Sequence, residues 1–290
     1  MRNIYTEEEL KRVLGKAGQR AKVGLVPTMG ALHEGHLALA ERSVAENDIT
    51  VVSIFVNPAQ FNDINDLARY PRTEEADMEL LSTVAGEEDI LFMPSESEIY
   101  PGGTRDMSGP PLCDLEGADR VMEGRFRPGH FNGVVRVVSR LFDIVLPDNA
   151  YFGEKDFQQL AVIRIMTKKM GYNTNIVGCA TMRERDGLAM SSRNMLLEPN
   201  FRARGAVIFR TLNELVPILW EKGVDEAEGY FNERVAGEGF VPEYFEVVNE
   251  SDLQPVKGGI PEVARGERYR ICVALYAGNV RLIDNIPAHI

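Results

Sequence analysis

Cysteine, histidine and tryptophan are scarce in this chain, which has three cysteines, four histidines and one tryptophan among 290 residues. Cys113, Cys179 and Cys272 are scattered and have no paired spacing, which argues against a disulfide framework and against a cysteine metal site. We therefore expect a reducing compartment, and the cytoplasm is the simplest one. No apolar run reaches the ~18 residues that a membrane span needs. Residues 1–9 also lack the apolar core of a secretory signal, so we expect none.

Positive charge is in deficit, because 32 Lys and Arg residues face 44 Asp and Glu residues, for a formal net charge of −12. Such a chain repels polyanions unless it gathers basic residues on one face, and the sequence has no large Lys/Arg cluster. We therefore expect no nucleic-acid partner, whereas small anionic substrates remain possible. A Walker-type Gly-x-x-x-x-Gly-Lys-Ser/Thr loop is absent, so any use of ATP must rest on another motif.

The first two-thirds of the chain alternates short apolar runs with amphipathic stretches. We predict strands at residues 23–26, 49–56, 90–93, 150–152 and 175–180. We predict helices at residues 6–16, 36–46, 73–83, 131–146 and 157–170. Strands separated by helices of this length predict an α/β fold with a Rossmann-like, doubly wound parallel sheet. In such sheets ligands bind beyond the carboxyl ends of the strands.

The pattern changes after about residue 194. We predict helices at residues 198–222 and 224–235, with Trp220 in the core, and strands at residues 244–248, 268–276 and 280–284. These elements predict a smaller antiparallel α+β unit. We therefore divide the chain into an N-terminal domain, 1–183, and a C-terminal α+β lid domain, 184–290, with residues 182–187 as the hinge.

The most informative segment is the one that follows the first predicted buried strand. His33 and His36, two of the four histidines, lie where that strand leads into the predicted helix 36–46. A helix N-terminus offers free backbone N–H groups and a positive dipole end, which suit a phosphate. Two imidazoles there could donate to a phosphate whose charge rises during reaction. The pattern predicts a nucleotide α-phosphate site, and the alternative is a capping histidine beside a surface one.

Asn57 and Gln60 come directly after the second predicted strand, where Pro58 favours a turn. A neutral amide can hydrogen-bond a hydroxyl and a carboxylate alike, so these residues are candidates for binding a hydroxy acid. Turn chemistry alone accounts for Asn57 but leaves Gln60 unexplained.

Arg127 and His130 lie in a Gly- and Pro-containing loop that leads into the predicted helix 131–146. A cation and an imidazole at that place are candidates for binding an anionic substrate. The alternative is a solvated basic loop.

Gly153 and Lys155 follow the strand at 150–152 and precede the helix at 157–170. Glycine permits close approach of the backbone, and the lysine offers a mobile ammonium for phosphate oxygens. Asp156 stays open between a ligand role and a helix N-cap.

Residues 190–193, Met-Ser-Ser-Arg, follow the Gly-containing segment 185–187. A cation and hydroxyls on a mobile loop could close over a triphosphate and exclude water, which makes Arg193 a candidate. The alternative is an ordinary linker between domains.

The string Pro-Thr-Met-Gly-x-Leu-His-x-Gly-His at residues 27–36 resembles the pantoate–β-alanine ligase family. Its last four positions are similar to the His-x-Gly-His signature of the nucleotidylyltransferase superfamily. Further blocks that resemble the family follow in order at residues 55–61, 70–73, 127–131, 153–156 and 190–194. The resemblance implies an ATP-dependent ligase that activates pantoate as its acyl-adenylate, releases pyrophosphate, and transfers the acyl group to β-alanine to give pantothenate and AMP.

The resemblance also implies roles for single residues. The implied catalytic residues are His33, His36, Lys155 and Arg193. The implied ATP site comprises Met29, Gly30, Ala31, Leu32, His33, Glu34, Gly35, His36, Gly153, Glu154, Lys155, Asp156, Met182, Met190, Ser191, Ser192 and Arg193. The implied site for pantoate and β-alanine comprises Asn57, Gln60, Tyr70, Arg127, His130 and Gln159. The resemblance further implies a homodimer formed through the N-terminal domain.

Asp77 is the candidate ligand for Mg²⁺. Family members carry adjacent acids after Tyr-Pro-Arg-Thr that help to hold the magnesium of ATP through water, and here Ala76 stands in place of the first. Magnesium usually takes only one or two protein carboxylates, so one acid could suffice. The alternative is that Asp77 only favours the helix N-terminus electrostatically.

Two other functions stay open. A plain nucleotidylyltransferase would use the same histidines but would keep the adenylate as its product. An inactive nucleotide-binding regulator would be favoured by the loss of a catalytic cation, yet His36, Lys155 and Arg193 are all present.

Overall fold

The computed structural model describes residues 1–16, 18, 21–258 and 267–288, which form two compact units. The first unit comprises residues 1–119, 124–154 and 159–180. The second comprises residues 120–123, 155–158 and 181–290. The segments 120–123 and 155–158 therefore belong to the second unit although they precede its main part, which no local feature of the sequence indicates.

The first unit contains a six-stranded sheet whose paired strands are all parallel. The strands are β1 (Arg2–Ile4), β2 (Val23–Thr28), β3 (Ile49–Ile54), β4 (Ile90–Phe92), β5 (Asn149–Gly153) and β6 (Asn175–Cys179), in the order β1-β4-β3-β2-β5-β6. The predicted fold class is confirmed, as are the five predicted strands. Strand β1 was missed because an edge strand this short carries no periodicity. The strand order reverses between β2 and β5, which is the ligand-binding position of such sheets.

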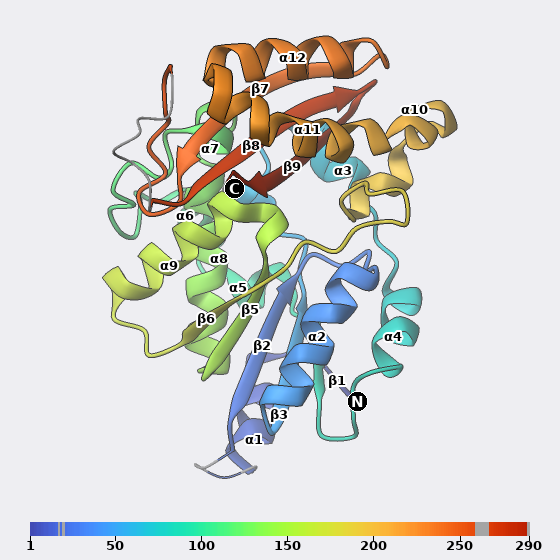
Figure 1. Cartoon of the computed structure of the whole chain (residues 1–290). Coiled ribbons are helices and arrows are strands. Elements are labelled where there is room, and N and C mark those ends of the chain that lie inside the picture. Colours follow the sequence, from blue (N-terminus) through green and yellow to red (C-terminus); the bar gives the residue numbers. More distant parts are fainter. Residues whose placement is uncertain (17, 19–20, 259–266, 289–290) are drawn as a thin grey trace. The chain divides into compact units, whose positions relative to one another are not determined.

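Five helices match the predicted ones (Figure 1): α1 (Glu7–Lys16), α2 (Glu34–Glu46), α4 (Glu74–Ser82), α8 (His130–Val145) and α9 (Phe157–Met170). Helix α2 covers the sheet by packing Leu39 and Ala40 against Val26 and Val52. The prediction missed several short elements: α3 (Ile64–Arg69), α5 (Glu96–Ile99), α6 (Thr104–Ser108), α7 (Met122–Phe126), and the 3₁₀ turns η1 (Pro58–Gln60), η2 (Glu154–Asp156) and η3 (Ser192–Leu196). Elements of one or two turns are too short to show a helical hydrophobic pattern.

The second unit packs helices on an antiparallel sheet, as the sequence predicts. Its main elements are α10 (Pro199–Arg204), α11 (Ala206–Lys222), α12 (Val224–Ala236), β7 (Val241–Asn249), β8 (Tyr269–Ala277) and β9 (Val280–Pro287), with strand order β7-β8-β9. The prediction of one helix over residues 198–222 is wrong. The helix is interrupted at Gly205, because glycine is a weak helix former. Trp220 packs against the core of this unit, and its indole N–H donates to the Ala288 carbonyl at 2.8 Å.

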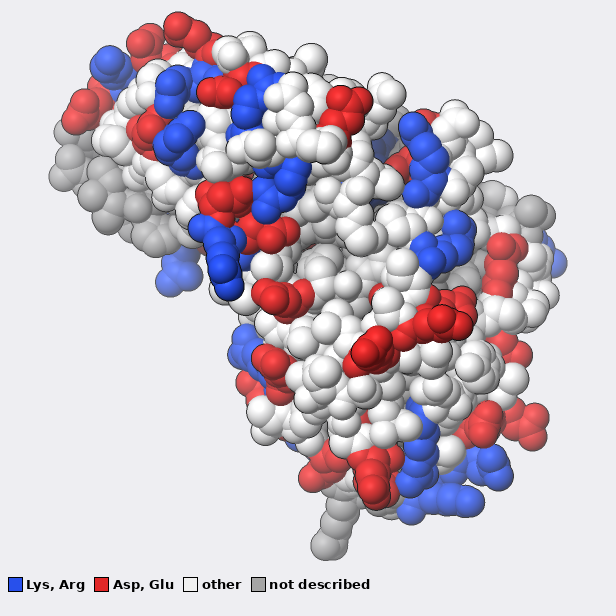
Figure 2. Space-filling view, turned by 90° about the vertical axis from the view of Figure 1, so that its right-hand side faces the viewer, with Lys and Arg blue, Asp and Glu red and all other residues white. Residues whose placement is uncertain are grey.

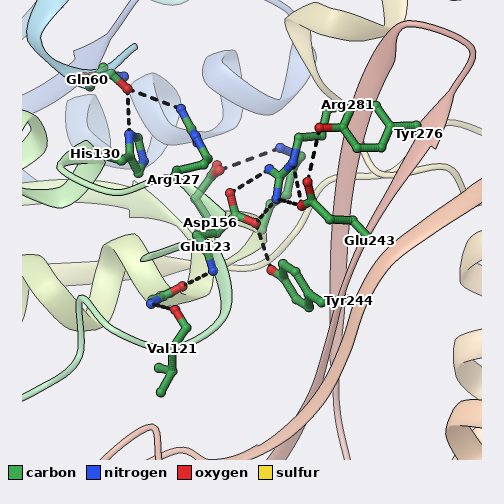
Figure 3. A network of polar contacts seen from close by, with 12 residues as sticks. Gln60, Val121, Glu123, Arg127, His130, Asp156, Glu243, Tyr244, Tyr276 and Arg281 are labelled. Atoms are coloured by element: carbon green, nitrogen blue, oxygen red, sulfur yellow. Dashed lines mark hydrogen bonds and ion pairs between the residues drawn. The ribbon is translucent and has the colours of Figure 1, made fainter. Parts of the chain in front are cut away.

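A partly buried ion-pair network ties the segment 120–123 to the rest of the second unit. Figure 3 shows Arg281 flanked by Glu123 and Glu243. The Arg281 guanidinium donates to the two Glu123 oxygens at 2.7 and 2.8 Å, and the Tyr244 hydroxyl donates to Glu123 at 2.8 Å. Burial and the Glu123 charge raise the pKa of Tyr244 well above its ordinary value, so its hydroxyl keeps its proton.

Two properties of the described residues bear on the expected partners. Among the described helices, none is long and apolar enough to cross a membrane. On the face that Figure 2 presents, Lys and Arg side chains are interspersed with Asp and Glu. That face therefore lacks a single-sign field of the kind that steers a polyanion.

Candidate active site

The loop that leads from β2 into α2 has an unusual backbone. Gly30 and Ala31 both have positive φ, at 77° and 49°. Glycine adopts this region freely, whereas an L-residue such as alanine is strained there. A Cβ at position 30 would also lie 3.0 Å from Ile54 and 3.1 Å from Asp77. The loop therefore needs both a glycine and an outside contact that stabilises its shape.

Asp77 on α4 supplies that contact. Its side chain is buried, and its two oxygens accept hydrogen bonds from the backbone N–H groups of Ala31, at 2.9 Å, and Leu32, at 2.8 Å. The Thr73 hydroxyl donates to the same carboxylate at 3.0 Å, instead of capping α4. Asp77 thus lies one turn into its helix, as predicted, and it fixes the loop before α2.

His33 is the N-cap residue of α2. Its Nδ1 accepts the Gly35 backbone N–H at 3.1 Å, so the hydrogen of the neutral ring is on Nε2. The rings of His33 and His36 lie 4.1 Å apart between centroids. The capping alternative is thus confirmed for His33.

Turn η1 follows β3 and carries Gln60. The backbone carbonyl of Gln60 accepts from His130 Nδ1 at 2.8 Å and from the Arg127 guanidinium at 3.3 Å (Figure 3). His130 is buried, so the solvated-loop alternative is wrong for it. Arg127 and His130 thus hold the backbone of a predicted substrate residue.

Helix α8 and turn η1 are in backbone contact at Gly133. A Cβ at this position would lie 2.2 Å from the Ala59 carbonyl oxygen and 2.7 Å from the Gln60 nitrogen. No side chain fits there, so the requirement for glycine is one of space rather than of φ.

We expect Gly133→Ala to displace η1 and to lower the free energy of unfolding by about 2 kcal/mol, as overpacking does. Thermal unfolding and turnover assays measure the two effects. Gly229→Ala is the control, because a Cβ there meets nothing within 4 Å. If Gly133→Ala behaved like this control, the contact would not matter.

Lys155 and Asp156 belong to the second unit, whereas Gly153, Glu154 and Gln159 belong to the first. The Lys155 ammonium lies 3.8 Å from Asp156, and the Lys155 carbonyl accepts from the Asn285 amide at 2.8 Å. The role of Asp156 as ligand or cap stays open.

Residues 182–190, which include the predicted hinge at residues 182–187, form a closed turn. The Met190 N–H donates to the Met182 carbonyl at 3.0 Å, and Arg183 pairs with the buried Asp284 at 2.7 and 2.9 Å. Ser191 then caps η3 by accepting the Arg193 N–H at 3.3 Å. Arg193 is therefore carried on an ordered turn of the second unit.

Tyr70 and Tyr100 are both buried in the first unit. Tyr70, a predicted substrate residue, packs edge-on against Phe61 with ring centroids 5.7 Å apart. Tyr100 was missed, and its hydroxyl donates to Asn57 at 2.7 Å. It lies outside every recognised motif, so no signal in the sequence could have found it.

Known proteins are similar to this chain in sequence and in fold. A sequence model described as pantoate-beta-alanine ligase matches residues 2–287. A pantothenate synthetase of Bacteroides thetaiotaomicron is 49% identical over 290 residues, which cover 99% of this chain and 98% of that protein. The chain belongs to the pantoate-beta-alanine ligase family. The family and the enzyme class that the motifs indicate are thereby confirmed.

Solved structures of the family agree in fold. Pantothenate synthetase from Thermus thermophilus superposes with a TM-score of 0.86 at 40% identity, and all of both chains is covered. The ligase from Francisella tularensis, solved with beta-gamma ATP and beta-alanine, gives a TM-score of 0.78 at 34% identity, covering 99% of this chain and 98% of that one. Because these matches span whole chains, both units of the ligase have counterparts in the family.

Proposed function

We propose that this ligase joins pantoate to β-alanine in two steps, through a pantoyl-adenylate intermediate. In the first step a pantoate carboxylate oxygen attacks the α-phosphorus of ATP, and pyrophosphate leaves. In the second step the β-alanine amine attacks the acyl carbon, the amine loses a proton, and AMP leaves as pantothenate forms. The related Francisella ligase, solved with beta-gamma ATP and beta-alanine, supports these substrates.

The observation that carries the proposal is the loop before α2. Its backbone, held by Asp77, leads into a helix N-terminus where the rings of His33 and His36 lie side by side. This lies at the carboxyl end of β2, where the strand order reverses. A carboxylate is already ionised at neutral pH, so the first step needs positioning and charge stabilisation more than a strong base. The two imidazoles are the groups that we propose for charge stabilisation.

We assign four residues to stabilisation of the reacting phosphates: His33, His36, Lys155 and Arg193. We assign ATP binding to the loop 29–36 together with Gly153, Glu154, Asp156, Met182 and residues 190–192. We assign pantoate and β-alanine to Gln60, Gln159 and Tyr70, with Asn57, Arg127 and His130 supporting Gln60. The support for Asn57, Arg127 and His130 is that each of them contacts Gln60.

Magnesium is proposed to enter with ATP. In the part of the chain that the structure describes, no group of three or more His, Cys, Asp or Glu residues could hold a metal. The Asp77 oxygens accept three hydrogen bonds and are buried, so this carboxylate does not fit direct coordination. Bound to the phosphates, the ion would neutralise part of their charge.

The product of ATP cleavage tests the function. With ATP, pantoate and β-alanine, we expect AMP, pyrophosphate and pantothenate in equal amounts, as measured by chromatography. Omitting β-alanine should stop turnover after the adenylate forms. Stoichiometric ADP would exclude the adenylate, whereas full turnover without an amine would favour a plain nucleotidylyltransferase.

We further propose that the first unit is an ATP- and pantoate-binding domain and that the second unit is a C-terminal lid domain.

We also propose that the ligase is a homodimer formed through its N-terminal domain and that it works in the cytoplasm. The cytoplasm is consistent with Cys113, Cys179 and Cys272, which are free thiols. Light scattering at micromolar concentration should give twice the 32.4 kDa chain mass. A mass equal to that of one chain would exclude the proposed homodimer.

A further inference from the structure

Asn57 has its carboxamide oriented by two backbone groups. The Ala59 N–H, which can only donate, lies 3.2 Å from Oδ1, and the Gly133 carbonyl, which can only accept, lies 3.1 Å from Nδ2. Turning the amide over would place donor against donor and acceptor against acceptor. The contact of η1 with α8 therefore favours one orientation of the Asn57 amide.

The orientation of Gln60 follows from that of Asn57. The second hydrogen of Asn57 Nδ2 is donated to Gln60 Oε1 at 3.0 Å, so the other end of the Gln60 amide must be its NH₂ group. That group lies 2.9 Å from the sulfur of Met29, in the loop after β2. A thioether is a weak acceptor, so a substrate oxygen would replace it with a gain in hydrogen bonding.

Tyr100 completes the chain of hydrogen bonds from the side opposite Gln60. Its hydroxyl donates to Asn57 Oδ1 at 2.7 Å, and burial raises its pKa, so the hydroxyl keeps its proton. Tyr100 and Asn57 are 3% and 1% exposed, so water does not compete for these bonds. Asn57 thereby has all its donors and acceptors engaged inside the protein.

We propose that Tyr100 is a positioning residue that acts through Asn57 to hold Gln60 with its NH₂ group toward the substrate. The ligase thus presents a neutral hydrogen-bond donor to the acid substrate. This donor favours a substrate that offers an ionised carboxylate or another acceptor oxygen. A neutral donor holds the carboxylate without the charge neutralisation that a cation would cause, so the oxygen stays nucleophilic. The inference rests on the proposed contact of Gln60 with pantoate.

Two variants test it through the KM values. Tyr100→Phe should raise the KM for pantoate about three- to tenfold and leave the KM for ATP unchanged, since one hydrogen bond of the chain is lost. Tyr151→Phe is the control, because Tyr151 is equally buried and its hydroxyl contacts Asn47 and Glu46 instead. Equal KM values for pantoate in Tyr100→Phe and wild type would overturn the inference.

Gln60→Glu tests the polarity even if Tyr100→Phe does not fold. A carboxylate can only accept, so the KM for pantoate should rise about 100-fold at pH 8. Unimpaired pantoate binding at pH 8 would show that Gln60 accepts rather than donates. Gln60→Ala tests the contact of Gln60 with pantoate separately from the positioning role of Tyr100. If this variant left the KM for pantoate unchanged, the proposed contact itself would be wrong.

Discussion

Replacing His36 with alanine is expected to slow adenylate formation by about 10²–10³-fold, while ATP affinity changes far less. His36 lies in the first turn of α2 beside the His33 ring. Loss of one donor that stabilises developing charge typically costs this much in rate. The binding of ATP also draws on the backbone and on other cations, so affinity depends less on one ring.

Single-turnover quench measurements with ATP and pantoate separate these effects. Glu41→Ala, at an exposed position of the same helix, controls for changes in the helix itself. An intact chemical step in His36→Ala, with only weaker ATP binding, would assign the residue to binding alone.

Asp77→Asn is expected to lower the free energy of unfolding by about 3 kcal/mol, since hydrogen bonds to charged groups contribute about 1.5–3 kcal/mol each. An asparagine has one acceptor oxygen, so its NH₂ group would face the N–H of Ala31 or Leu32. The strained backbone at Ala31 would then relax, and the loop before α2 would lose its shape. We therefore expect adenylate formation to fall together with stability.

The magnesium dependence distinguishes this role from the ligand role that the sequence suggests. If Asp77 held the metal, Asp77→Asn would raise the magnesium concentration needed for half-maximal turnover. Because its oxygens are bonded to the loop and to Thr73, we expect that midpoint to stay unchanged. Glu75→Gln, at an exposed position of the same helix, is the control and should change neither property. A raised midpoint with full stability would restore the metal role.

Elements whose causes are local can be recognised from the sequence. Strands such as β2 and β3 are short apolar runs, and helices such as α9 have a repeating apolar face, so both can be recognised without a partner. The placement of His33 and His36 at the start of α2 was also predictable, because the strand, the turn and the first helical turn are consecutive in the chain.

The contacts that hold this segment in place arise only in the folded chain. Asp77 contacts a loop 46 residues earlier, and Tyr100 contacts Asn57 across 43 residues. Gly133 shows no sign in the sequence that a backbone carbonyl passes against it. Such pairs are brought together by the order of the strands and the packing of helices on the sheet, and a buried carboxylate or hydroxyl is engaged by whichever group packing places beside it. The sequence therefore indicated which residues could do the chemistry, and the fold decided which residues hold them in place.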